Sequence, residues 1–442
     1  MFAFPGQYAL VMKSLFLFPL FLLGMDRNTI GTEQALPAMT KEAGEKMGKN
    51  TILKLLPISF QACKGYAEIQ GVGAGPFNPA LWEKNTLNWV PEFRHPLIPP
   101  RLSGPSRNIY APSAVWTGAA WRLFYGAWDG VPTGNDRIYS VTTQNFLDFD
   151  DWKIVIEHGM FQHVCNVSAV HTPEKNFEMF CTVYPDELGL NKPAFFSSPD
   201  GESWNGSPQP YPAQRSDIVK INGYDKYPAQ SDVNGGNVLL REDGKIRLYF
   251  HNFLDGGKVF CATSGDGKNF AFNGTALYAK HAWLVNDMKK FHVDERDFYL
   301  MGLHRNGPDL WYALSGDGLA FPEERKLFDH KDERDRFIVA LGWVVRENSL
   351  LGVLYGAGDF EGLFRNRIFA RWLQKRIQVK DKNGNVLNPA GSLGPDRALF
   401  EIPKQGKLEG TLILYSEDGQ TKLSETAVSL EQGWIYEIDI KH

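Results

Sequence analysis

The sequence predicts an all-β protein: a five-bladed β-propeller followed by a small C-terminal β-sandwich. Three observations lead to this prediction. A polar turn motif recurs at matching places in the chain, five successive units each contain three short strands, and a different strand pattern follows them. The composition agrees, because 13% of the 442 residues are aromatic and 43 Gly and 26 Pro are present, as expected where tight turns join many short strands.

Residues 1–63 are predicted to be an export leader without stable structure. Lys13 precedes the apolar run SLFLFPLFLLGM, which as a helix would span about 18 Å of a ~30 Å bilayer core, so it reads as a signal-peptide core. A second candidate, MGKNTILKLLPISFQACKG, begins at Met47 and resembles a bacterial lipoprotein signal with Cys63 as the lipidated residue. We therefore expect a bacterial protein that is periplasmic, membrane-anchored or extracellular. The alternative is that both stretches are simply unstructured sequence.

Residues 64–107 are rich in proline and irregular, as in GPFNPALW and RHPLIPPRLSGP. We expect this segment to wrap the propeller and to add the outermost strand that closes its ring.

The repeated motif has the form S-x-D-G-x-x-aromatic. It occurs as SPDGESW from Ser198, SGDGKNF from Ser264 and SGDGLAF from Ser315. Asp accepts hydrogen bonds from backbone N–H groups two residues on, Gly supplies a positive φ, and the aromatic ring covers the hairpin. Three copies at equivalent places indicate a structural repeat.

Five units lie between Asn108 and Trp372, each with a β-rich strand, a polar turn, an aromatic-rich strand, a loop and a third strand. Dividing residues 108–372 by five gives about 53 residues per unit, close to the roughly 40–50 of propeller blades. Radial closure also removes the exposed edges of such sheets. Residues 373–442 carry hairpin turns at Asn383-Gly384 and Asp418-Gly419 and are predicted to form the sandwich.

Charge and cysteine content exclude several classes of partner. The net charge is -4 and no long basic block is present, so nucleic acid is not an expected partner. Four cysteines occur without a C-x-x-C pair, so no zinc site or thioredoxin-like motif is predicted. We expect no cofactor and no metal among the candidate site residues. Cys165 and Cys181 flank one predicted hairpin and are interpreted as buried free thiols.

Candidate site residues lie just before the first strand of each blade or just after the second, because both positions reach the axial mouth of a propeller. The mouth is predicted to gather carboxylates, imidazoles, amides and aromatic rings, a combination that suits sugars. These residues are Trp128, Asp129, Asn166, Glu187, Asp232, Asn234, His251, Asp287, His304, Arg305 and Asp359.

The segment YAPSAVW and the three hairpin motifs resemble the five-bladed glycoside hydrolases of families 43, 32, 62, 68 and 117, over about residues 108–372. The resemblance implies an Asp base at the start of blade one, where this chain has Ala111-Pro112-Ser113. It implies a second Asp at Asp232 or Asp287, whereas the usual acid Glu has no match. The resemblance to family 117 implies a histidine as the acid. Some of the resembled families hold calcium at the propeller axis, so a structural calcium ion there is an open alternative.

The leading hypothesis is a glycoside hydrolase acting on an extracellular oligo- or polysaccharide. Asp232 and Asp287 would form the carboxylate centre, Asp129 is a further candidate base, and His251 or His304 would be the acid. The predicted substrate-binding residues are Trp128, Asn166, Glu187, Asn234, Arg305 and Asp359. Two alternatives are a non-catalytic carbohydrate-binding propeller and a glycoside phosphorylase or transglycosylase. Asp136 and His163 are interpreted as structural residues.

Overall fold

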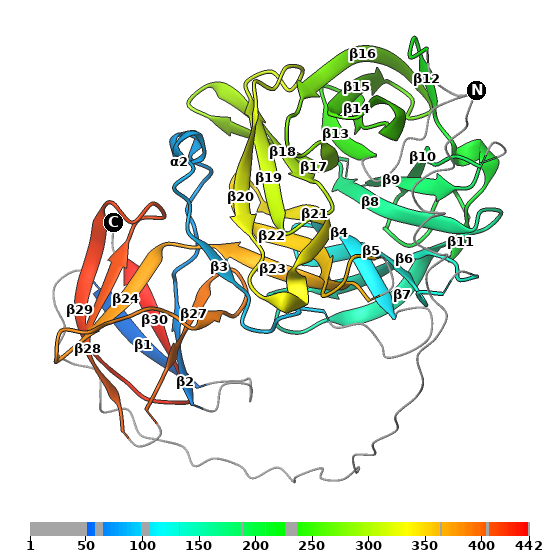
Figure 1. The fold of residues 1–442 in the computed structure, drawn as a ribbon. Helices are drawn as coiled ribbons and strands as arrows, with labels where there is room; N and C mark the ends of the chain where they lie inside the picture. Colours follow the sequence, from blue (N-terminus) through cyan, green and yellow to red (C-terminus); the bar gives the residue numbers. More distant parts are fainter. Residues whose placement is uncertain are drawn as a thin grey trace, which may run out of the picture. The chain divides into compact units, whose positions relative to one another are not determined.

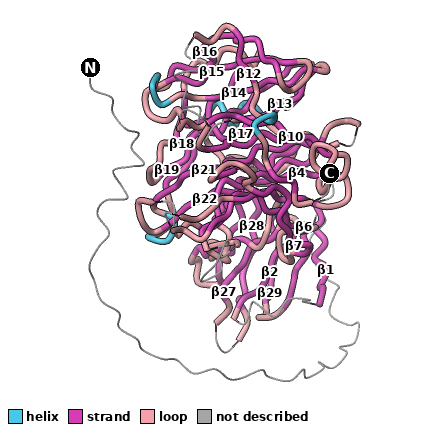
Figure 2. Tube along the Cα trace, turned by 90° about the vertical axis from the view of Figure 1, so that its right-hand side faces the viewer, coloured by secondary structure: helices cyan, strands magenta, loops and turns pink. Residues whose placement is uncertain are grey.

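The protein is described here by a computed structural model. It describes residues 51–57, 65–98, 107–131, 133–174, 176–186, 189–207, 209–225, 237–362, 365–403 and 406–440. The first predicted signal sequence and residues 47–50 and 58–64 of the second, Cys63 among them, lie outside these residues. Within the described residues, strands dominate (Figures 1 and 2) and helix is confined to α2 (Pro79–Lys84) and short 3-10 turns.

Five antiparallel sheets follow one another along the chain and form the blades (Figure 1). Blade 1 contains β4 (Asn108–Trp116), β5 (Trp121–Trp128), β6 (Arg137–Thr143) and β7 (Asp150–Glu157). Blade 2 contains β8 (His163–His171), β9 (Phe177–Tyr184) and β10 (Lys192–Ser198). Blade 3 contains β13 (Val238–Glu242), β14 (Lys245–Phe250), β15 (Lys258–Ser264) and β16 (Asn269–Tyr278).

The last two blades complete the ring. Blade 4 contains β17 (Leu284–Val293), β18 (Arg296–His304), β19 (Asp309–Ser315) and β20 (Glu324–Asp329). Blade 5 contains β21 (Phe337–Arg346), β22 (Ser349–Gly358) and β23 (Arg367–Leu373). The first strands of the blades, β4, β8, β13, β17 and β21, each pack against the next, and β21 packs against β4. The all-β, five-bladed propeller predicted from the sequence is therefore confirmed.

Two short strands from the connection between blades 2 and 3 extend the outer edges of other blades. β11 (Tyr211–Pro212) pairs in parallel with β7, and β12 (Lys220–Asn222) pairs in parallel with β16. They cover edges that would otherwise expose unpaired backbone groups.

The ring closes through the segment that precedes blade 1. β3 (Trp89–Pro91) pairs antiparallel with β23 and becomes the fourth strand of blade 5. The following residue, Glu92, is fully buried and accepts hydrogen bonds from the Trp372 indole (2.7 Å) and the Gly394 N–H (2.8 Å). The Arg94 guanidinium, 2.8 Å away, compensates its charge, as a buried carboxylate requires.

The C-terminal sandwich is built from two sheets. One has the order β1-β30-β2-β27-β26 and the other β25-β24-β28-β29. Their strands are β1 (Thr51–Pro57), β2 (Tyr66–Gln70), β24 (Arg376–Asp381), β25 (Val386–Leu387), β26 (Gly391–Ser392), β27 (Arg397–Glu401), β28 (Leu408–Tyr415), β29 (Lys422–Leu430) and β30 (Trp434–Ile440). One apolar core, including Ile69, Val379 and Leu414, joins them.

Two sequence predictions differ from this arrangement. Residues 51–57, placed in the leader, form β1 and pair with β30, and residues 66–70, placed in the wrapping segment, form β2 between β27 and β30. The sandwich is therefore discontinuous in sequence. A short strand gains its stability from its neighbours in the sheet, so the sequence of either segment alone did not reveal its place.

The hairpin motif has the geometry that the sequence predicts. Asp317 Oδ1 accepts the backbone N–H groups of Leu319 (2.8 Å) and Ala320 (2.9 Å), and Gly318 has a φ of 69°. The copies at Asp200 and Asp266 make the same pair of bonds. The three aromatic residues that end the copies, Trp204, Phe270 and Phe321, are all buried.

We expect Gly318→Ala to lower the free energy of unfolding by about 2 kcal/mol. A Cβ at this position would lie 2.7 Å from both the Tyr299 ring and the Arg247 guanidinium, and an alanine at this φ is strained. Gly316→Ala, in the same turn, meets no atom within 4 Å and is the matched control. Urea unfolding of both variants tests this, and equal loss of stability in the two would contradict it.

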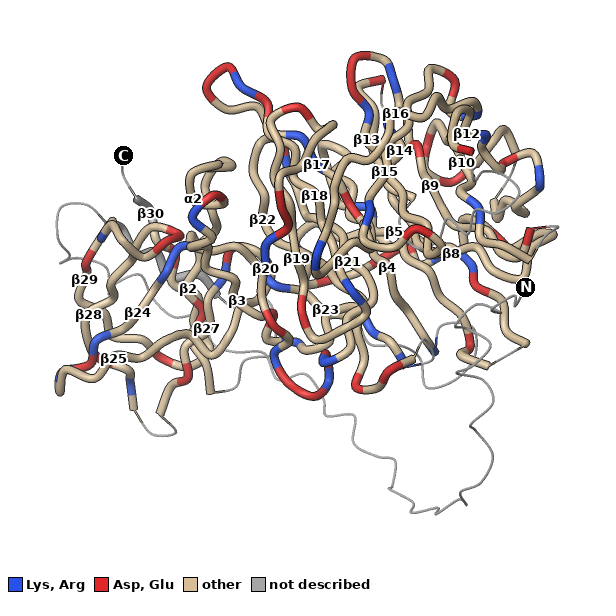
Figure 3. Tube along the Cα trace, turned by 45° about the horizontal axis from the view of Figure 1, so that its top comes forward, with Lys and Arg blue, Asp and Glu red and all other residues tan. Residues whose placement is uncertain are grey.

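Positively and negatively charged residues are interspersed along the described chain (Figure 3). No helix among the described residues is both long and apolar enough to cross a membrane.

Candidate active site at the propeller axis

The innermost strands bulge near their starts. β4 shifts register between Tyr110 and Ser113, and β8 shifts between Cys165 and Ser168. Ala111 (φ 49°) and Asn166 (φ 54°) lie in the left-handed region at these bulges. Such bulges re-aim side chains and are frequent beside functional sites.

Glycines of blade 5 make room for the first of these bulges. A Cβ on Gly342 would collide with the Pro112 carbonyl oxygen, and one on Gly356 would lie 3.1 Å from the Ala111 nitrogen. Blade 5 therefore holds the Tyr110–Ser113 bulge by direct backbone contact.

Residues after the bulges tie neighbouring blades together. Ser113 Oγ accepts the Ala169 N–H (3.0 Å), and Ser168 Oγ accepts the Leu239 N–H (3.2 Å). Asp287 repeats this bond, because its Oδ2 accepts the Trp343 N–H at 2.7 Å.

The other oxygen of Asp287 is also occupied. Oδ1 accepts the N–H of Met288 (2.8 Å) and the ammonium of Lys289 (2.7 Å), and the residue is 2% exposed. This geometry makes Asp287 an inter-blade tie and does not support its predicted role as a catalytic carboxylate.

A polar cluster lies where blade 1 meets the first strand of blade 2. The Tyr110 hydroxyl donates to Asp136 Oδ2 (2.8 Å), and His163 Nδ1 lies 3.2 Å from the same oxygen. Asp136 and Tyr110 are each 4% exposed, whereas the His163 side chain is 18% exposed. A buried carboxylate thus lies beside an imidazole whose edge reaches solvent, although the 3.2 Å approach lacks hydrogen-bond geometry.

Two groups that stay protonated, Tyr110 and Cys165, and two aromatic rings surround the Asp136 and His163 side chains. Burial, and next the charge of Asp136, raise the pKa of Tyr110 well above its usual value, so Tyr110 stays a donor. Burial also raises the pKa of the Cys165 thiol, which stays protonated. The Trp128 ring meets His163 edge-on at 5.6 Å, and the Tyr184 ring stacks on it at 5.9 Å.

The sequence analysis selected Asn166 at the start of β8 but interpreted Asp136 and His163 as structural. His163 begins the innermost strand β8, the placement used to select Asn166, whereas Asp136 precedes β6, the third strand of blade 1. The signal for His163 was therefore its position as the first residue of an innermost strand. Trp128 and Asn166 both lie near the cluster and are half-buried.

Asp129 is turned toward its own loop. Its Oδ1 accepts the Val131 N–H at 3.1 Å, and the side chain packs over Gly134. This is the bonding of a turn-forming aspartate.

His251 and His304 are both buried, at 1% and 3% exposure. Burial lowers the pKa of His251 to about 3, with a contribution from His304, and burial lowers the pKa of His304 to about 3. Both imidazoles are therefore neutral near pH 7, which does not support the predicted role of either one as a proton donor. His304 Nδ1 instead accepts the Asn306 N–H (3.2 Å) and so positions the loop after β18.

Arg305 and Asp359 lie in loops that leave the second strands of blades 4 and 5. The Arg305 guanidinium binds both oxygens of Asp309, each at 2.7 Å. The carbonyl of Asp359 accepts from Arg336 (2.8 Å), and its side chain is exposed. Three further predicted residues, Glu187, Asp232 and Asn234, lie outside the described residues.

The described residues do not fit an axial calcium ion. The inward polar groups after the bulges are already bound to backbone N–H groups and to Lys289. Among the described residues, one group of His, Asp and Glu has metal-ligand spacing, namely His95, Asp332 and Asp335. The Arg334 guanidinium binds both oxygens of Asp332, and this positive charge opposes a cation.

No family model matches the chain, and no curated protein matches it. Similar solved structures do exist. One represents the GH130 family of mannoside phosphorylases, which contains glycoside hydrolases that target β-1,2 mannosidic linkages in Candida mannan; it has a TM-score of 0.47 and 12% identity, covering 64% of this chain and 93% of that one.

Two others are the catalytic domain of a Coprinopsis cinerea GH62 α-L-arabinofuranosidase and a Bombyx mori GH32 β-fructofuranosidase. The first has a TM-score of 0.45 and 13% identity over 65% of this chain and 98% of that one. The second has a TM-score of 0.44 and 12% identity over 81% of this chain and 97% of that one. These structures are glycoside hydrolase-like folds, and this chain is similar to them at low identity.

Proposed function

We propose that the protein is a glycoside hydrolase that cleaves an oligo- or polysaccharide at the axial mouth, with His163 as the group that moves the proton. The pairing of His163 with the buried carboxylate of Asp136 is the observation that supports this most strongly. A carboxylate on one imidazole nitrogen fixes the ring and stabilises its protonated form, which leaves the other nitrogen for the substrate.

The chemical step would run as follows. The imidazolium of His163 donates its proton to the glycosidic oxygen as the bond from that oxygen to the anomeric carbon breaks. A water molecule attacks the anomeric carbon and gives its proton to a carboxylate base. Asp136 keeps its negative charge throughout and acts as a positioning residue.

The base is proposed from the sequence. Asp232 precedes the first strand of blade 3, the placement that the resemblance to five-bladed hydrolases implies for a functional Asp. Asp359 is the described alternative, since its carboxylate is exposed on the β22–β23 loop. Export, which the leader predicts, would bring the protein together with extracellular polysaccharides.

A second candidate function is non-catalytic carbohydrate binding. The residues at the two bulges favour it, because Ala111 carries only a methyl group and Asn166 carries an amide. At the position of Ala111, a hydrolase of the resembled families would have a carboxylate. Aromatic rings such as Trp128 would serve either function.

Incubation of the full chain with plant, fungal and algal polysaccharides, followed by analysis of soluble products, tests the proposal. We expect shorter saccharides to appear without added phosphate. Binding without products would favour the binding protein instead. Products that require phosphate, and that carry it, would identify a phosphorylase.

A further inference from the structure

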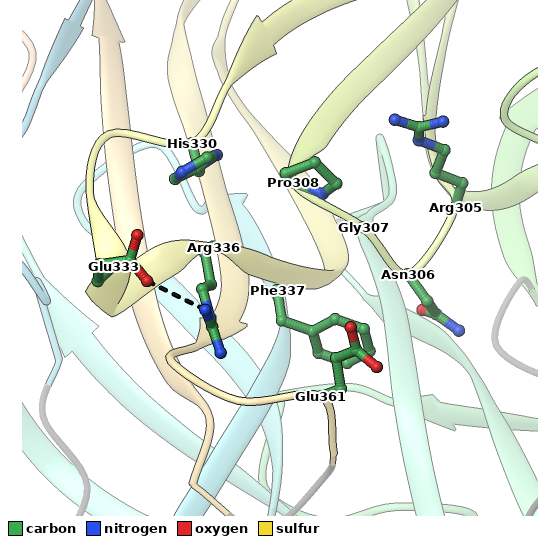
Figure 4. A pocket seen from close by; sticks show the side chains of 9 residues that line it. All are labelled: Arg305, Asn306, Gly307, Pro308, His330, Glu333, Arg336, Phe337 and Glu361. Atoms are coloured by element: carbon green, nitrogen blue, oxygen red, sulfur yellow. Dashed lines mark hydrogen bonds and ion pairs between the residues drawn. The ribbon is translucent and has the colours of Figure 1, made fainter.

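A pocket of ≈ 670 Å³ opens between blades 4 and 5, within the range of about 300–1,000 Å³ typical of small-ligand sites. Three elements line it: the loop after β18, the connection between blades 4 and 5, and the loop after β22 (Figure 4). Its lining residues are Arg305, Asn306, Gly307, Pro308, His330, Glu333, Arg336, Phe337 and Glu361.

The pocket adjoins the proposed catalytic cluster through Phe337. This ring lines the pocket, and it also packs in one hydrophobic cluster with Tyr110, Cys165 and Trp128. Tyr110 is the residue whose hydroxyl binds Asp136. A substrate held against Phe337 would therefore lie beside the hydrophobic cluster that contains Tyr110.

Both arginines of the pocket have carboxylate partners. Two arginines and two glutamates line it, Arg336 pairs with Glu333 at 3.1 Å (Figure 4), and Arg305 is held by the buried Asp309. Because each guanidinium already has a carboxylate partner, an anionic ligand would have to displace one of these carboxylates. It would also be repelled by Glu361, which has no cationic partner among the described residues.

The remaining polar groups are suited to hydroxyls. Asn306 is exposed and has a φ of 55°, and the bond from its N–H to His304 fixes the loop. Paired ions and an amide offer donors and acceptors side by side, and sugar hydroxyls are both donors and acceptors. The half-buried Phe337 supplies the apolar face on which a sugar ring can stack.

We propose that this pocket is the subsite for an uncharged sugar residue and that the substrate is a neutral glycan rather than one rich in uronic acid, sulfate or phosphate groups. The role of this subsite in cleavage rests on the proposed function. Binding of the sugar in the pocket does not require turnover and can be measured without it.

The test uses the full chain with His163→Ala, so that bound saccharides stay intact. Isothermal titration calorimetry would compare neutral cello-, manno-, xylo- and arabino-oligosaccharides with oligogalacturonides and oligoalginates. We expect a neutral series to bind with an affinity that changes little between 50 and 500 mM salt, because screening acts only on charges. Phe337→Ala should weaken that binding about tenfold, whereas Trp152→Ala, on the outer strand β7, should leave it unchanged.

A charge variant makes the test sharper. Glu361→Gln should leave the binding of the neutral series within about twofold and should raise the affinity for the acidic series, since it removes a negative charge that has no cationic partner among the described residues. Glu347→Gln makes the same charge change at the far end of blade 5, in the β21–β22 turn, and is the control.

Each outcome decides a different point. Preferred, salt-sensitive binding of the acidic series by the unmodified pocket would overturn the neutral subsite and leave the hydrolase standing. Neutral binding that ignores Phe337→Ala would overturn the assignment to this pocket, as would the absence of any binding. Neutral binding through Phe337 by a wild-type chain that never releases products would support the subsite and overturn the hydrolase.

Discussion

Replacing His163 with alanine is expected to lower kcat by about 10²–10⁴-fold on whichever glycan the wild-type protein cleaves. The imidazole is the one group of the described axial cluster that combines a buried carboxylate partner with an edge open to solvent. Without it, the leaving oxygen would depart unprotonated. Because sugar contacts are provided elsewhere, KM should change much less than kcat.

Asp136→Asn tests the positioning role separately. An amide keeps the shape of the side chain but removes the negative charge beside the imidazole, so kcat should fall while KM changes little. His171→Ala is the matched control, because His171 lies at the other end of β8 and packs on Phe177 at 4.8 Å. Wild-type turnover by the His163 variant, in a folded protein, would eliminate the proposed mechanism.

Lowering the pH from about 6.5 to 4.5 is expected to remove on the order of 5 kcal/mol of stability through His251 and His304. Burial lowers the pKa of each to about 3 in the folded state, whereas an unfolded histidine titrates near 6.5. The unfolded state therefore takes up protons first. Stability is fully present above pH 6.5 and is lost progressively as the pH falls toward 3.

Urea unfolding of wild type and His251→Leu at pH 7 and pH 4.5 measures this effect. The variant has similar volume and no titrating group, so it should lose about half of the pH dependence. His292→Gln is the control, because the His292 side chain is 66% exposed. A wild-type protein equally stable at both pH values would show that these imidazoles are not buried as described.

Much of the fold was predictable because its signals are local. The hairpin motif works through bonds between Asp317 and the next few backbone N–H groups, so three copies in the sequence were enough to identify equivalent turns. Strand alternation and blade length then led to five blades. The strands β1 and β2 escaped prediction because pairing with distant strands determines their place.

The sequence by itself determined that this chain is all-β, that five similar sheets follow one another, and that their polar ends meet at one mouth. Only the tertiary structure decided which polar residues there are free to act. Sequence alone does not distinguish the surroundings of Asp287 from those of Asp136. The Asp287 oxygens accept from the Trp343 N–H of the next blade and from Lys289, whereas Asp136 Oδ2 lies beside the His163 imidazole. The chemistry of a carboxylate depends on what its two oxygens touch, and here those partners come from strands that the ring brings together across long stretches of chain.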